Sequence, residues 1–353
     1  MSSIQTPNRP SGDAEQGWLD RIRTSSRDSQ RAVPPAIRAH PYAAIAVFTV
    51  CVMAFFVLGE RSEATLNYGN QWLLYATVVV GFYYVFGVSG QFAFCQAAMM
   101  GVGAYTSALV APDHGFVLGL LAALVVVAAV ALVFALLVMR SGHFYFAIAT
   151  LGLAQIVRVV LYQWTWFAGH GGFRLNIPAP EIFGFEFTSQ YRMLWMSLGL
   201  LVVGLLLGTW IDRSPMKREA IAFRDRDLVA STLGVPIGRI RLQIFVVGSC
   251  YAAAAGAVFA HWQRILSPDS FGVDLGVGIF LMLVLGGAST VWGGVIGAAF
   301  YVFVPAELKS LNEYREVVYG LVLMIVIIRF PGGLATVRQV IDRIGARRRR
   351  REA

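Results

Sequence analysis

The sequence predicts an all-α fold: a polytopic helical membrane protein with about eight to ten membrane segments, some of them candidates for re-entrant segments. Apolar residues make up 57% of the 353 residues and charged residues only 14%, whereas soluble domains carry about 45–50% and about 25%. The mean hydropathy of +0.64 points the same way. A soluble globular fold is therefore excluded.

Ten apolar tracts are candidates for the membrane segments, because most of them approach the length of about 20 residues that a helix needs to cross a bilayer. They lie at 41–59, 72–88, 92–111, 115–139, 143–162, 193–211, 243–262, 275–289, 291–305 and 317–330. Glycines interrupt the tract at 92–111, and glycines also flank Thr290, which separates the tracts at 275–289 and 291–305. These three tracts are therefore candidates for half-helices. The count then falls to about eight.

The tracts leave two polar ends and one polar loop. Residues 1–40 are rich in Pro, Ser and Arg and contain no apolar stretch typical of a signal peptide, so we expect a disordered cytoplasmic tail. Residues 41–336 form the membrane domain, in which 212–242 is a charged cytoplasmic loop, and residues 337–353 form a basic cytoplasmic tail. A second globular domain does not fit.

The basic residues predict the orientation of the chain in the membrane. Most of the 29 Lys and Arg residues lie before residue 41, between Arg213 and Arg241, and from Arg329 onward. If the tracts alternate in direction, these groups fall on one side, and basic loops stay in the cytoplasm. We therefore expect a multi-pass protein of the cytoplasmic membrane with both termini in the cytoplasm. The net charge of +9 reflects this topology and does not indicate a nucleic-acid partner.

Several kinds of active site are excluded by the sequence. The P-loop of an ATPase needs a lysine after glycine, but Lys217 follows Met216 and Lys309 follows Leu308. The histidines and cysteines are scattered, without the spacing of a metal or catalytic site. We expect a protein that is not an enzyme, with no catalytic residues, no metal and no cofactor.

Charges within the tracts are almost absent. None of the tracts contains Asp or Glu, which disfavours a stand-alone carrier, because proton- or sodium-coupled carriers usually need an ionisable group in the membrane. Arg158 lies well inside a tract, near its predicted outer end. Two interpretations stay open for Arg158. Either its aliphatic side chain extends so that the guanidinium reaches the membrane–water interface, or its charge contributes to a substrate path.

Two stretches rich in small residues, 87–108 and 286–297, are candidates for a polar path through the membrane. Broken helices free backbone groups that can line such a path, and the amides of the first stretch lie in apolar surroundings. Tight helix packing without a ligand explains small residues equally well. The candidate path residues from these stretches are Gly90, Gln91, Gln96, Gly101, Gly103, Gly286 and Gly287.

The charged loop contains a predicted amphipathic helix at 214–236. Ser214 and Pro215 are a plausible start, and Gly234 and Pro236 a plausible end. One face carries Ala220, Phe223 and Leu228, and the other carries Lys217, Arg218, Arg224, Asp225, Arg226 and Asp227. Such a helix docks in the groove of a partner or lies at the membrane surface. The mixed charge favours the partner.

Five ordered blocks of the sequence resemble the permease subunits of high-affinity branched-chain amino acid ABC transporters, and more narrowly the M-type subunit. The resemblance covers about residues 68–336. The blocks are GVSGQFAFCQAAMMGVGAYTSAL from Gly87, SGHFYFAIATLGLAQIVRVV from Ser141, the charged loop, SPDSFG at 267–272 with VLGGASTVWGGVIGA at 284–298, and YGLVLMIVIIRFPGGL at 319–334. The chain departs from the family at Ala93, Cys95 and Lys217, where the family usually has Ser, Gly and Gly.

The resemblance implies the function and the partners. A subunit of this family imports branched-chain or related amino acids with a homologous second permease, two cytoplasmic ATPase subunits and an extracytoplasmic substrate-binding protein, within membrane lipid. It also adds Tyr105 and Thr150 to the candidate path and places the ATPase-coupling helix in the charged loop, where Arg224, Asp225, Asp227 and Gly234 match the family. The helical spacing adds Ala220, Phe223 and Leu228 as the apolar anchors in the partner's groove. The alternatives are a urea or short-chain amide permease of the same family, a stand-alone secondary carrier and a membrane scaffold.

Overall fold

The computed structural model describes residues 41–58, 62–138, 143–182, 185–225 and 236–308, together with residues 320, 321 and 324. The two polar tails predicted at 1–40 and 337–353 lie outside the described residues. The same holds for most of the tract predicted at 317–330 and for residues 226–235 of the charged loop.

The described chain is helical apart from short connections, which confirms the predicted fold class. Its helices are α3 (Pro41–Leu58), α4 (Glu63–Phe82), the π-helix η1 (Tyr83–Val88), α5 (Gln96–His114), α6 (Phe116–Val138), α7 (His143–Gln163), α8 (Thr165–Ala168), the 3-10 helix η2 (His170–Gly172), α9 (Gln190–Arg213), α10 (Pro215–Asp225), α12 (Ile237–Gln263), the 3-10 helix η3 (Pro268–Phe271), α13 (Val273–Gly286) and α14 (Val291–Glu307). Two antiparallel two-residue strands, β1 (Glu181–Ile182) and β2 (Phe185–Glu186), form a small hairpin.

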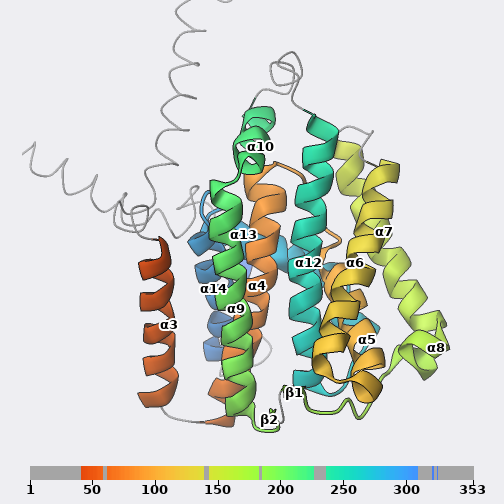
Figure 1. The fold of residues 1–353 in the computed structure, drawn as a ribbon, viewed down its shortest axis with the longest axis vertical. Coiled ribbons are helices and arrows are strands. Elements are labelled where there is room, and N and C mark those ends of the chain that lie inside the picture. The colour runs from red at the N-terminus through yellow and green to blue at the C-terminus, as the bar shows by residue number, and fades with distance from the viewer. Residues whose placement is uncertain are drawn as a thin grey trace, which may run out of the picture.

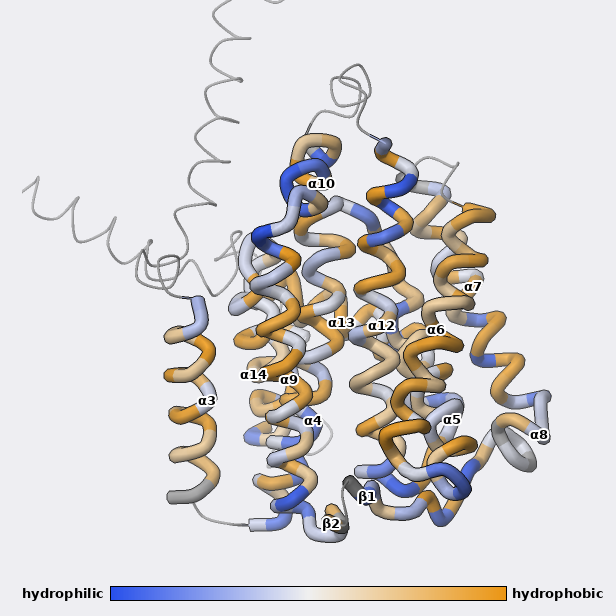
Figure 2. Tube along the Cα trace, in the orientation of Figure 1, coloured by the Kyte–Doolittle hydropathy of each residue, from blue (hydrophilic) through white to orange (hydrophobic). Residues whose placement is uncertain are grey.

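The long helices run along one axis of the molecule (Figure 1). One end, called the α10 end, carries α10, and α3 starts on the side facing this end; the other, called the hairpin end, carries β1 and β2. Figure 2 shows hydrophilic residues at α10 and at the neighbouring end of α12, whereas the stretches between the two ends are mainly hydrophobic. This distribution is typical of helices whose middle portions lie in a bilayer.

Six helical segments of the described chain have the length and apolar composition to cross a membrane. They are Glu63–Val88, Phe116–Val138, Tyr145–Gln163, Gln190–Arg213, Ile237–Gln263 and Pro268–Gly286, and two shorter apolar helices cover Pro41–Phe56 and Val291–Glu307. The first segment begins earlier than the apolar tract predicted, because Ser62 caps α4 by accepting a hydrogen bond from the Thr65 backbone N–H, and the polar first turns are helical. The tract at 92–111 forms a helix only from Gln96 onward.

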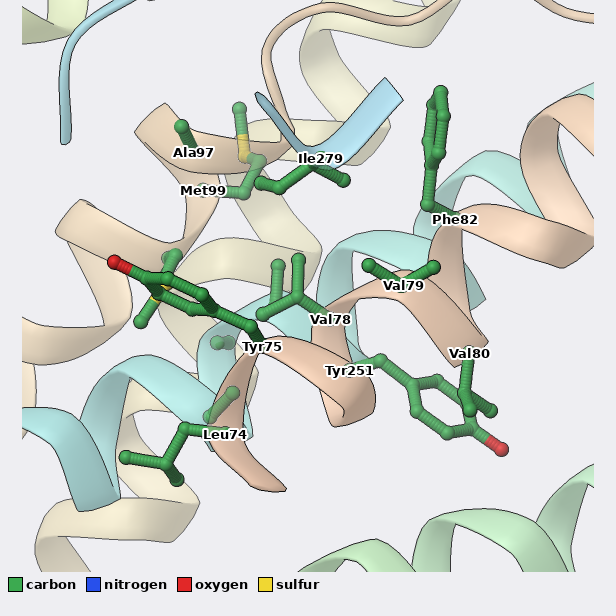
Figure 3. Close-up of a cluster of buried hydrophobic side chains, with 14 of the residues drawn as sticks. Leu74, Tyr75, Val78, Val79, Val80, Phe82, Ala97, Met99, Tyr251 and Ile279 are labelled. Carbon is green, nitrogen blue, oxygen red and sulfur yellow. The ribbon is translucent and has the colours of Figure 1, made fainter. Parts of the chain in front are cut away.

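Helix α4 forms the centre of the core. Figure 3 shows side chains of α4 packed against Ala97 and Met99 of α5, Tyr251 of α12 and Ile279 of α13. Helix α6 lies at the periphery and shows the opposite arrangement of side chains. Its buried stripe is made mostly of small residues at four-residue spacing, Gly119, Ala123, Val127, Ala131 and Ala135, whereas large side chains such as Leu136 and Leu137 are exposed. Small residues inside and large apolar residues outside fit a helix that packs closely on one side and contacts lipid on the other.

Candidate translocation and coupling sites

The chain unwinds between η1 and α5, within the stretch that the sequence predicts as a broken helix. In η1 each backbone N–H donates to the carbonyl five residues earlier, one more than in an α-helix, as in Ser89 N to Tyr84 O at 3.2 Å. Gly90 then has a φ of +72°, a conformation that favours glycine, and α5 starts at Gln96. Such π-helical segments frequently occur at functional sites, and here the segment leads into the break before α5.

Two amides from this break point into the protein. Gln91 is 3% exposed; its Nε2 donates to Ser89 Oγ at 2.7 Å, and its Oε1 has no partner among the described residues. Gln96 is 1% exposed, and neither of its amide atoms has such a partner. A buried polar atom left without a hydrogen bond costs about 1–3 kcal/mol. Gln91 and Gln96 are therefore the path candidates with free capacity to bind a polar group.

The predicted path glycines pack against neighbouring helices of the same chain. A Cβ at Gly101 would lie 2.9 Å from Phe271, and one at Gly103 would lie 2.6 Å from the Ala253 backbone in α12. At Gly286 it would lie 1.7 Å from the Gly293 carbonyl oxygen, and Gly287 adopts a φ of +108° in the turn that follows. At Gly101, Gly103 and Gly286 the structure shows close packing, which is one of the two explanations for these small residues.

Tyr105 and Thr150 are buried and hold neighbouring segments in place. The Tyr105 hydroxyl donates to the Gly172 carbonyl at 2.5 Å and so joins α5 to η2. The Thr150 hydroxyl accepts a hydrogen bond from the backbone N–H of Phe94 at 3.2 Å and so joins α7 to the break. Both residues position the break and the helix that follows it.

A cavity of about 540 Å³ opens at the hairpin end of α4, α9 and α12. It is lined by Asn67, Tyr68, Gln71, Thr188, Gln190, Met193, His261, Trp262, Gln263 and Arg264. None of the predicted path residues is among these. No motif in the sequence indicates this cavity, because its polar residues come from separate segments.

Helix α10 begins at Pro215, as the loop sequence predicts, and packs on its own chain. Ala220 is fully buried and Phe223 is 1% exposed, and the Arg241 guanidinium of α12 lies 5.2 Å from the Phe223 ring centre. The sequence predicts these two side chains as anchors in a partner's groove, whereas in this structure residues of the same chain cover them. Asp227, Leu228 and Gly234 lie outside the described residues, and α10 ends at Asp225.

Polar contacts connect α10 to the break. The Arg224 guanidinium donates to the carbonyl of Gly87 in η1. Lys217 Nζ lies 2.7 Å from Asp212 Oδ1 and 5.7 Å from the centre of the Tyr83 ring. Burial by itself would lower the pKa of Lys217, but Tyr83 and Asp212 outweigh it and hold the pKa above its ordinary value. Lys217 is therefore a stable cation between α9, α10 and η1.

Arg158 has a partner that the sequence did not indicate. Its Nη2 lies 2.5 Å from Oδ1 of Asp269 in η3, and the Tyr162 hydroxyl donates to Oδ2 of the same carboxylate at 2.5 Å. Asp269 was missed because it lies outside the apolar tracts and 111 residues along the chain. The part of the chain that the structure describes contains no group of three His, Cys, Asp or Glu side chains that could hold a metal.

The chain is similar in sequence to known membrane permeases. The family model described as branched-chain amino acid transport system / permease component matches residues 64–327. The high-affinity branched-chain amino acid transport system permease protein LivM is 27% identical over 300 residues in both Salmonella typhimurium and Escherichia coli, covering 77% of this chain and 70% of the relative.

Two other kinds of permease are also similar. The permease protein LivH of Escherichia coli, from the same kind of transport system, is 24% identical over 291 residues, covering 74% of this chain and 90% of LivH. The autoinducer 2 import system permease protein LsrC of Klebsiella pneumoniae is 30% identical over 195 residues, covering 51% of this chain and 54% of LsrC. No solved structure matches the chain.

Proposed function

We propose that this chain, which belongs to the family of branched-chain amino acid transport system permease components, is the membrane-spanning subunit of an importer. The solutes of this importer are branched-chain or related amino acids. The chain is a multi-pass helical membrane protein. It carries out no covalent chemistry. ATP is hydrolysed by two cytoplasmic partner subunits, a homologous permease completes the path, and an extracytoplasmic binding protein delivers the solute.

The observation that carries this proposal is the connection between α10 and the broken helix. Arg224 holds the Gly87 carbonyl, and Lys217 joins Asp212 to Tyr83. A displacement of α10 by an ATPase therefore reaches η1 and the break directly. Gln91 and Gln96 project from this segment, so the same movement changes the polar surroundings along the membrane-embedded chain.

The orientation follows from the charges at the two ends of the molecule. Arg213, Arg218 and Arg239 are exposed and lie on α10 or on the helix ends beside it. Basic residues mark the cytoplasmic side, so we assign the α10 end to the cytoplasm. Helix α3 starts on the side facing this end in Figure 1, which supports a cytoplasmic N-terminal segment, and the basic sequence after residue 337 supports a cytoplasmic C-terminus.

Transport by the complete assembly tests this function. This chain, a second permease, both ATPases and the binding protein are reconstituted into vesicles with ATP inside, and uptake of radiolabelled leucine and urea is followed. We expect leucine uptake that needs both ATP and the binding protein and persists after a protonophore collapses the proton gradient. Uptake of urea in place of leucine would favour the amide permease. Gradient-driven uptake by this chain alone would show a secondary carrier.

A further inference from the structure

Helix α7 carries a polar stripe that the described chain leaves partly uncovered. Gln155, Arg158 and Tyr162 follow one another at spacings of three and four residues, so they lie on one face of the helix. Gln155 is exposed, and the other two are half-buried. Polar and charged side chains are expensive against lipid and in membrane helices usually face a bundle interior or a water-filled cavity. This face of α7 therefore belongs to an aqueous path or to a protein interface.

Asp269 in η3 completes a charged cluster on this face. Arg158 Nη2 lies 2.5 Å from one carboxylate oxygen of Asp269, and the Tyr162 hydroxyl donates to the other at 2.5 Å. The side chains of Arg158 and Asp269 are 41% and 56% exposed, so the ion pair is open to a solute. The Arg158 Nε–H has no hydrogen-bond partner in the described ranges. The cluster thus offers a cation and an anion side by side.

The two halves of this cluster belong to segments that contact the break and the helix that follows it. Helix α7 is joined to the break through Thr150 and the Phe94 backbone. Helix η3 packs on α5 through Phe271, which lies against Gly101. A movement of the break relative to α5 therefore changes the separation between Arg158 and Asp269.

We propose that Arg158, Tyr162 and Asp269 form a subsite for the carboxylate and ammonium groups of a zwitterionic α-amino acid. The Arg158 guanidinium binds the carboxylate, because its planar set of donors matches two carboxylate oxygens. Asp269 binds the ammonium group, and the Tyr162 hydroxyl keeps the Asp269 carboxylate in position. This inference rests on the proposed function and names the chemical groups by which the permease recognises its solute.

A bound zwitterion can replace the contact between Arg158 and Asp269 with one contact to each of these residues, which is why an ion pair suits the binding of an amino acid. Without a solute, Arg158 and Asp269 neutralise each other, so neither charge is left uncompensated near the membrane. A zwitterion brings one charge of each sign, and after the exchange every charge again has a partner. A solute with only an amine or only a carboxylate leaves one protein charge unpaired, and neutral urea replaces neither partner. The subsite therefore favours amino acids over amides.

The test uses the complete reconstituted transporter and measures two rates. Leucine uptake reports passage through the subsite, and ATP hydrolysis stimulated by the loaded binding protein reports assembly and folding. Arg158→Gln, Asp269→Asn and the charge-exchanged double variant R158D/D269R are compared with wild type. We expect all three to lower leucine uptake per ATP hydrolysed by about tenfold or more, while stimulated hydrolysis remains. Gln163→Ala, an exposed polar change in the last turn of α7, is the matched control and keeps the wild-type ratio.

The charge exchange separates recognition from a purely structural tie. A tie between α7 and η3 works with either order of charges, so recovery of coupled uptake in R158D/D269R would overturn the subsite. Wild-type uptake in both single variants would overturn it as well. A wild-type transporter that carries no amino acid would instead overturn the proposed function and this inference with it.

Discussion

Single glycines between α5 and α12 set how closely these two helices approach. A Cβ at Gly103 would lie 2.6 Å from the Cα and carbonyl oxygen of Ala253, and one at Gly256 would lie 2.0 Å from the Met100 carbonyl oxygen. Backbone atoms cannot rotate away as side chains do. In a membrane, where apolar burial drives helix association weakly, such close contacts carry much of the packing energy.

Gly103→Ala is expected to lower the stability of the chain by about 1–3 kcal/mol, because the added methyl group forces α5 and α12 apart. The midpoint of thermal unfolding in detergent, followed by the loss of monodisperse protein, measures the effect. Gly199→Ala in α9 is the control, since a Cβ there meets no atom within 4 Å. Equal midpoints for the two variants would contradict the packing role of Gly103.

Phe223 supports α10 from within the same chain, so its loss acts first on the permease itself. Phe223→Ala removes a ring that is 1% exposed and is expected to cost about 3–5 kcal/mol. The isolated chain in detergent should unfold at a lower temperature, and α10 should become accessible to protease. Phe173→Ala, a change at an exposed ring, serves as the comparison. A stable isolated variant that fails only to bind the ATPase would restore the original assignment of Phe223 to the partner interface.

The sequence indicates that Ala220 and Phe223 share an apolar face, but it does not specify which surface covers that face. Helical spacing shows that the two residues share one apolar face, and this spacing is independent of which surface covers the face. The location of that surface depends on α12, which follows α10 after the loop, and on η1, which is distant in sequence from α10. Asp269 was missed for the same reason, because an ion pair across 111 residues leaves no local pattern.

Among the elements, α10 and η1 are connected by a small number of contacts that can be removed singly. Arg224→Ala deletes the donor to the Gly87 carbonyl while leaving the buried face of α10 intact. We expect transport per ATP hydrolysed to fall about tenfold or more, because a hydrogen bond from a charged group contributes about 1.5–3 kcal/mol. Arg239→Ala, at an exposed residue in the first turn of α12, should keep the wild-type ratio. Full coupling in Arg224→Ala would exclude this contact from the transmission of force.

The break before α5 could be predicted from the sequence, but the π-helix that leads into it could not. The glycines and amides of 87–108 indicate a discontinuity. In contrast, residues 78–88 form an almost uninterrupted apolar run, and a run without alternating polar residues carries no information about residues per turn. Only the packing of α4 against neighbouring helices determines that η1 adopts π-helical winding and not α-helical winding.

For the whole molecule, the distribution of charge predicts which end faces the cytoplasm. Single cysteines are introduced at Ala222 in α10 and at Phe173 near the hairpin end, both exposed, in a background without Cys51, Cys95 and Cys250. In intact cells an impermeant maleimide should label the cysteine at 173 and reach the one at 222 only after permeabilisation. The reverse pattern would invert the orientation.

The overall architecture follows from composition more completely than the site does. Apolar tract length determines which segments become membrane helices, and nine of the ten predicted tracts fall on helices of the described chain. The polar cluster and the cavity depend on how these helices are arranged around α4. Closely spaced glycines indicate that two helices approach each other, but the sequence does not specify which helices do so.

The π-helical winding of η1 has a consequence for insertions and deletions. A π-helical stretch holds one residue more than an α-helix of the same hydrogen-bonded pattern, and each residue of an α-helix accounts for a rotation of about 100°. Deleting one residue within η1 would therefore let α-helical winding continue to Val88 with little change in the direction in which the α4 side chains point. A deletion within the regular turns of α4 would instead rotate the preceding part of α4 by about 100° relative to Gly90 and turn its packed face away from α9, α12 and α14. One-residue deletions are therefore expected to be tolerated within η1 and to disrupt packing within α4.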